Sequence, residues 1–194
     1  NSRLEAFCDG VFAIAITLLI IDIKIPSSVA INNTSDFWLA LKQITPSIFS
    51  FVLSFMIIYI TWVNHHNSLK LINKSSTSFI YTNGFLLLTV VFIPFPTSLL
   101  GEHISTDHAA PAVILYNAVL ALQAIGWILI CRAALNNQLC KNEKAAQTIQ
   151  KNGRFGYFAF ILYSICAVAA FWFPLTIAMI TVITWTFWLI HSNT

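Results

Sequence analysis

The feature that most constrains this chain is a series of apolar stretches, each about as long as a helix needs to cross a bilayer. A membrane-spanning helix takes roughly 20 mostly apolar residues. Of the 194 residues, 58% are hydrophobic and only 9% are charged. Soluble domains carry about 25% charged residues, so this composition suits a surface in lipid. Because a helix satisfies its own backbone hydrogen bonds in lipid, the sequence predicts an all-α integral membrane protein.

We predict one domain, residues 1–194, with six transmembrane helices. Their expected ranges are about 4–25, 45–64, 78–100, 110–134, 155–172 and 174–191. Pro46 falls in the first turn of the second helix, where a missing N–H costs nothing. Pro94 and Pro96 are expected to bend or break the end of the third. Asp9 interrupts the first apolar run, which favours a first transmembrane helix over a signal peptide.

The distribution of basic residues supports six spans and sets their orientation. One side of the predicted topology holds Arg3, Lys70, Lys74, Arg132, Lys141, Lys144, Lys151 and Arg154. The other side holds only Lys24 and Lys42. Positive charge is retained in the cytoplasm, so both termini are expected to be cytoplasmic.

Two loops have a distinct character. The stretch 27–43 turns from polar to apolar, which fits a short interfacial helix with Ser35 or Asp36 as its N-cap. The stretch 136–153 is the longest polar connector and is expected to be solvated, with some helix.

The first predicted helix differs from the others because charged Arg3, Glu5 and Asp9 enter an otherwise apolar span. Ionisable groups are costly in a membrane and normally face a partner or water. One stripe can be followed at helical spacing through Phe7, Gly10, Ile14, Thr17 or Leu18, and Ile21. The small residues Gly10, Ala13 and Thr17 permit close helix packing.

This helix resembles a known family. Arg3 followed by Phe7-Cys8-Asp9 resembles the signature of the transmembrane protein 175 potassium channels, an Arg, three residues, then Phe-Ser-Asp. Trp62-Val-Asn-His65-His66 is similar to the Trp-x-x-His-His end of that family's second helix. Six spans in a chain this short also match its bacterial members. The family Ser is Cys8 here, which is a weaker hydrogen-bond partner.

The resemblance implies a homotetramer in the bacterial inner membrane that conducts K⁺ through a central pore lined by the first helix. The family has no TVGYG filter, and neither does this sequence. Its hydrophobic constriction falls on Ile14, with further rings at Leu18 and Ile21, and its selectivity threonine falls on Thr17. The motif residues Arg3, Phe7, Cys8, Asp9, Trp62, His65 and His66 are then expected to form a structural network.

These residues also have ordinary explanations. Ile14, Leu18 and Ile21 are alternatively side chains that face lipid or the core. Thr17 is able to hydrogen-bond the carbonyl of Ala13, as membrane threonines often do, whether or not it faces a pore. Asp9 is expected to serve structure rather than bind the permeating ion. Its candidate partners are Arg3 from another helix or subunit, and Trp62, His65 or His66.

Several classes of function are not supported. His65 and His66 are adjacent and point about 100° apart on a helix, so we expect no metal site and no cofactor. Basic residues are too scattered for nucleic-acid binding. There is no intramembrane Ser–Lys pair, no pair of catalytic carboxylates and no HExxH, so no enzyme is expected. The four cysteines show no CxxC and are expected to be reduced.

The sequence therefore predicts a potassium-selective channel, and two rivals remain open. A secondary transporter or proton-coupled carrier would need inverted repeats and broken helices at mid-membrane, for which Pro94 and Pro96 are the only hint. A membrane scaffold without transport is the other.

Overall fold

The computed structural model describes residues 2–21, 23–24 and 31–191. In chain order, the described helices are α1 (Ser2–Leu18), α2 (Thr34–Gln43), α3 (Thr45–Lys70), α4 (Thr77–Phe92), α5 (Pro94–His103), α6 (Ala109–Asn136), α7 (Glu143–Ala169) and α8 (Pro174–His191). Within these ranges no strand occurs, apart from an isolated bridge between Ile72 and Cys140. The predicted all-α fold class is confirmed.

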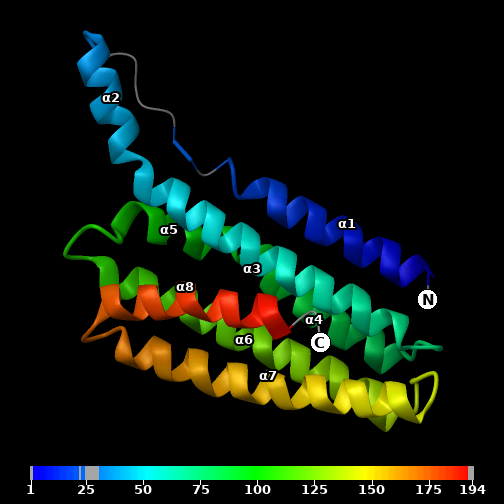
Figure 1. The fold of residues 1–194 in the computed structure, drawn as a ribbon. Helices are drawn as coiled ribbons and strands as arrows, with labels where there is room; N and C mark the ends of the chain where they lie inside the picture. The colour runs from blue at the N-terminus through cyan, green and yellow to red at the C-terminus, as the bar shows by residue number, and fades with distance from the viewer. Residues whose placement is uncertain (1, 22, 25–30, 192–194) are drawn as a thin grey trace.

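The long helices lie side by side, and α2 projects away from them at one end (Figure 1). The core centres on α6, which packs against α4, α5, α7 and α8. The α1 helix lies at the edge of the bundle, where it contacts α3 and α4. This arrangement leaves one face of α1 without a partner in the single chain.

Three stretches of the described chain form helices long and apolar enough to cross a membrane: Thr45–Lys70, Thr77–His103 and Ala109–Asn136. The α8 helix is apolar but shorter. The α1 helix has 17 residues, and α7 is charged in its first half. The chain is therefore a multi-pass membrane protein, and the count of six spans stays a prediction.

The helix ends differ from the expected ranges where polar side chains find partners inside the protein. The α3 helix continues past the predicted end to Lys70, because His65 is buried and bonded to a neighbouring helix. The α7 helix begins at Glu143 rather than near 155, capped by the side chain of Asn142, which accepts from the N–H of Ala145. The polar connector is thus largely helical.

The proline predictions are confirmed. The α4 helix ends at Phe92 and α5 begins at Pro94, which lacks the N–H that would continue the hydrogen-bond ladder. Ile93 lies between them and donates to Val90 three residues back. Pro46 sits in the first turn of α3.

Two smaller expectations need correction. The N-cap of α2 is Asn33, whose side chain accepts from the N–H of Asp36 at 2.9 Å, so neither Ser35 nor Asp36 is the cap. The reason is that the helix starts earlier, at Thr34. Residues 27–30 of the predicted interfacial stretch lie outside the described part of the chain. In addition, α1 ends at Leu18, so Ile21 lies in the turn that follows, where its N–H bonds Leu18.

Candidate functional site

The α1 helix has two faces of opposite character. Cys8, Phe12, Ala15 and Leu19 recur at helical spacing and are at most 1% exposed. They pack into the core shared with α3 and α4. This face fixes α1 against the bundle, because four apolar side chains are removed from lipid or water together.

The opposite face carries the predicted pore residues. Phe7, Ile14 and Ile21 are 63%, 58% and 72% exposed, and Leu18 is 38% exposed. Gly10, Ala13 and Thr17 are exposed on the same side. The structure therefore collects the predicted stripe on one uncovered surface, with small residues alternating with bulky aliphatic ones.

Thr17 bonds within its own helix. Its hydroxyl donates to the carbonyl of Ile14 at 2.9 Å, three residues back, and not to Ala13 as considered from the sequence. Because the hydroxyl proton is used inside the helix, the oxygen lone pairs are left to face outward. The exposed face thus presents an acceptor oxygen directly beside Ile14.

Asp9 of α1 is held by a hydrogen bond from α3. The indole N–H of Trp62 donates to the Oδ1 atom of Asp9 at 2.8 Å, and this bond is half-buried. Trp62 is positioned by ring contacts with Tyr59 and His66, each with 5.6 Å between centroids. Of the partners considered for Asp9, the structure selects Trp62.

The two histidines point to different partners, as expected for neighbours on a helix. Buried His65 is hydrogen-bonded through Nε2 to the Oδ1 atom of Asn83 at 2.7 Å, and its ring lies 5.4 Å from that of Phe12. His66 places Nδ1 3.3 Å from the Oε1 atom of Glu5. Those two atoms are within ion-pair distance but are not aligned as a hydrogen bond.

The other motif residues lie outside these contacts. Arg3 is exposed and makes no hydrogen bond or ion pair with any described residue. Phe7 is exposed on the stripe, and Cys8 is fully buried in the apolar face. Within the single chain the motif is therefore divided into a buried anchor, a polar flank and an exposed surface.

Asn83 and Glu102 were not found from the sequence, and Glu5 was noted there only as a charge in the first helix, without a partner. Glu5 faces His66, and Asn83 bonds His65 and also donates to the carbonyl of Phe79. Glu102 pairs with Lys24 beyond the far end of α1. A single Asn in an apolar span was the available signal for Asn83, whereas the pair of Lys24 with Glu102 joins residues far apart in the chain.

No metal centre emerges in the part of the chain that the structure covers. His, Cys, Asp and Glu side chains do not gather there in groups of three or more. The polar groups around α1 instead meet in pairs, Asp9 with Trp62 and Glu5 with His66.

Comparison with known proteins places these features in a family context. The sequence model of the endosomal/lysosomal potassium channel TMEM175 matches residues 3–94. A potassium channel of Chamaesiphon minutus is 38% identical over 160 residues, covering 80% of this chain and 78% of that protein. A potassium channel of Streptomyces collinus is 40% identical over 133 residues, covering 66% of this chain and 63% of that protein.

The fold agrees with a solved structure over its full length. The crystal structure of a lysosomal potassium-selective channel TMEM175 homolog from Chamaesiphon minutus superposes with a TM-score of 0.89 at 30% identity. The match covers 100% of this chain and 98% of that one.

Proposed function

The chain belongs to the endosomal/lysosomal potassium channel TMEM175 family, and on that premise we propose that it is a potassium-selective channel with a central pore lined by α1. Four copies assemble around one axis in this proposal. The family is one of ion channels and not of enzymes, and K⁺ is the permeating ion.

The observation that carries the proposal is the uncovered stripe on a helix whose other face is firmly anchored. Buried Phe12 and Leu19 fix the rotation of α1, and the Trp62–Asp9 bond fixes its flank. The stripe therefore points away from its own subunit. The bond of Thr17 to the Ile14 carbonyl is compatible with either lipid or a pore, and an aqueous pore gives the remaining acceptor capacity of its oxygen a use.

The stripe supplies the parts of a pore. A ring of Ile14 side chains forms a narrow apolar collar that opposes water and gates by dewetting. Rings of Leu18 and Ile21 continue this collar toward the outer end. An ion passing it sheds part of its hydration shell, and K⁺ holds water less tightly than Na⁺. The Thr17 oxygens replace lost water at the collar, which favours K⁺ moderately.

The proposed topology has six spans: α1, α3, α4 with α5, α6, α7 and α8. The carboxyl ends of α3 and α6 lie at the same end of the bundle as the amino terminus (Figure 1), and α3 ends at Lys70. By sequence, Lys74 follows α3 directly, and Arg132 and Lys141 flank the end of α6. This clustering supports cytoplasmic termini in a bacterial inner membrane. Two connectors are joined at this end, where Asn73 N–H donates to the Leu139 carbonyl at 2.9 Å.

The rival function is a carrier, and the break at Pro94 between α4 and α5 is the observation that favours it. A carrier places such a break beside a substrate site near the membrane midplane. The break here is instead packed, since Pro94 and Pro96 are buried. Saturable flux that depends on a second, coupled ion would support the carrier.

Flux through reconstituted protein tests the constriction. Ile14→Asn should raise K⁺ conductance and lower the K⁺/Na⁺ permeability ratio, because a polar collar holds water. The matched control is Ile161→Asn on α7, since Ile161 is 56% exposed and Ile14 58%. Single-channel recording and liposome flux measure both. Equal behaviour of the two variants would remove Ile14 from the constriction.

Crosslinking tests the assembly. Ile14→Cys, in a background in which the half-buried Cys140 is replaced by Ser, should form disulfide-linked dimers on mild oxidation. A disulfide needs Cα atoms within about 7 Å, so it forms only where the α1 stripes of two copies face each other, as they do around a shared axis. Ile161→Cys should not crosslink. A monomeric mass in detergent, or crosslinking of both variants alike, would contradict a pore lined by α1.

A further inference from the structure

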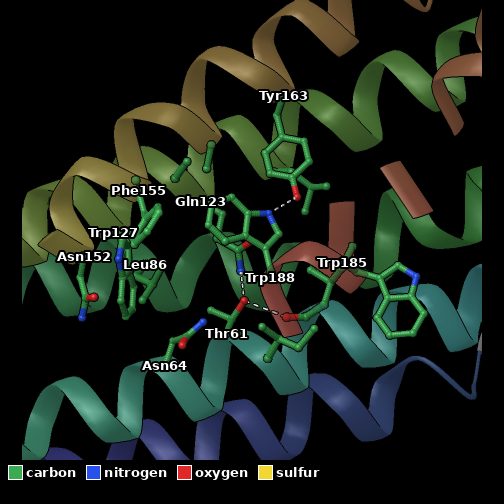
Figure 2. A pocket seen from close by; sticks show the side chains of 16 residues that line it. Thr61, Asn64, Leu86, Gln123, Trp127, Asn152, Phe155, Tyr163, Trp185 and Trp188 are labelled. Atoms are coloured by element: carbon green, nitrogen blue, oxygen red, sulfur yellow. Dashed lines mark hydrogen bonds between the residues drawn. The ribbon is translucent and has the colours of Figure 1, made fainter. Parts of the chain in front are cut away.

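A second feature of the bundle is a cavity of about 130 Å³ among α3, α4, α6, α7 and α8 (Figure 2). The α3 residues that line it, Thr61 and Asn64 among them, lie on the face of that helix opposite Trp62 and His66. Trp62 and His66 face α1. The α3 helix is thus a wall shared by the cavity and by the support of the predicted pore helix.

Polar groups with unused hydrogen-bonding capacity converge on this space. Gln123 is 8% exposed, and its amide donates only a long bond of 3.3 Å to the Thr61 hydroxyl. Thr61 itself donates to the carbonyl of Ile57 at 2.8 Å. The side-chain oxygen of Gln123 accepts from no described residue, and Asn64 makes no side-chain bond within the described chain. The free amide atoms are not sealed inside the protein, so water or a guest in the cavity is able to bond them.

The rest of the lining is uncharged and combines aromatic and aliphatic side chains with the amide of Asn152. Trp127, Phe155, Trp185 and Trp188 form the walls (Figure 2). The Trp188 indole N–H is satisfied by the hydroxyl of Tyr163 at 3.0 Å, so it is not offered to a guest. Every residue that lines the cavity is electrically neutral. A charged ligand would be desolvated there without a counter-charge, which excludes ions and acids as preferred guests.

We propose that this cavity is a binding site for a small uncharged amphiphile, and that its occupancy acts on the pore through α3. A hydroxyl or amide head group bonds the Gln123 and Asn64 amides, and a ring or short hydrocarbon lies against the tryptophans. The volume is on the scale of cavities that accept a benzene-sized guest. The site is separate from the permeation stripe. Only the coupling to flux rests on the proposed function.

The probe is 4-iodophenol, which is uncharged at neutral pH, carries one hydroxyl and quenches tryptophan fluorescence through its iodine. We expect saturable quenching of the wild-type channel in detergent. Ala159→Phe fills the cavity and should abolish the saturable part, whereas Val168→Phe, exposed on the same helix, should leave it unchanged. Gln123→Leu should weaken binding about tenfold, because a buried hydrogen-bonding partner is lost.

The position of the bound iodine in a crystal of the wild-type channel locates the site without relying on any variant. The structure of the wild-type channel soaked with 4-iodophenol should show iodine between Trp127 and Trp188. Quenching that rises linearly and equally in all variants, or iodine density elsewhere, overturns the proposal and leaves a cavity filled by water alone. The K⁺ flux of reconstituted wild type should change with the probe, and that of Ala159→Phe should not. Equal responses overturn the coupling through α3, while the binding readouts do not depend on conduction.

Discussion

Replacing Trp62 by phenylalanine removes one hydrogen-bond donor and keeps an aromatic ring between Tyr59 and His66. The lost bond runs from the indole N–H to the Oδ1 atom of Asp9 at 2.8 Å, a short distance for a bond to a carboxylate. Hydrogen bonds to charged groups contribute about 1.5–3 kcal/mol in soluble proteins. Interhelical bonds in membranes contribute less, on average about 0.6 and at most about 1.7 kcal/mol.

We therefore expect a coupling free energy of about 1–1.5 kcal/mol between Trp62 and Asp9, toward the upper end of the membrane range because the acceptor is a carboxylate. The assay is a double-mutant cycle with Trp62→Phe and Asp9→Ala, measured as free energies of unfolding in mixed detergent micelles. The cycle isolates the pair because each substitution removes the bond and neither phenylalanine nor alanine offers a new hydrogen-bonding group.

The control is Trp172→Phe, since Trp172 is 65% exposed in the turn before α8. It should change the unfolding free energy by less than about 0.5 kcal/mol and show no coupling to Asp9→Ala. A coupling energy below about 0.3 kcal/mol between Trp62 and Asp9 would refute the reasoning. The α1 helix would then be held by its buried apolar face alone.

Two further substitutions test the packing of the bundle. Gly101→Ala should lower the unfolding free energy by about 1–3 kcal/mol, because the new Cβ would lie 2.8 Å from the Cα of Ser47. The control Gly84→Ala should be tolerated, because no atom lies within 4 Å of its new Cβ. Equal losses of unfolding free energy in the two variants would count against a tight α3–α5 contact. Tyr116→Phe should cost about 1 kcal/mol, because the buried phenol loses its 2.9 Å bond to a serine of α3, whereas Tyr81→Phe on the surface should be neutral by thermal unfolding. No difference between the two tyrosines would mean that the buried bond contributes nothing.

The sequence was informative about elements and weak about their ends. The apolar runs predicted the α-helices, and Pro94 located the break after Phe92, because a missing N–H acts locally. The ends of α3 and α7 were missed. His65 ends an apolar run in the sequence, yet it continues the α3 helix because its side chain is buried and bonded to Asn83. The polar residues 143–154 precede an apolar run, yet they form the first turns of α7, where Asn152 contacts Ser68 of α3.

The candidate site was partly visible in the sequence. Helical spacing alone predicted that Phe7, Ile14 and Ile21 lie on one stripe. The motif resemblance added the prediction that this stripe lines a pore. The pairings of Glu5 with His66 and of Asn83 with His65 were missed, since each joins residues that are far apart in the sequence and on different helices. The cavity around Gln123 left no pattern that sequence reasoning used, because its lining comes from separate helices.

By itself the sequence determined that this chain is a helical membrane protein. Its apolar composition suits a bilayer, and helices satisfy their own backbone hydrogen bonds where no water is present. The sequence also determined which residues of α1 share a face, since helical spacing is local. Only the tertiary structure decided which face is buried. Phe12 and Leu19 are as apolar as Phe7 and Ile14, so periodicity cannot separate them, and it is the packing of α1 on α3 and α4 that does.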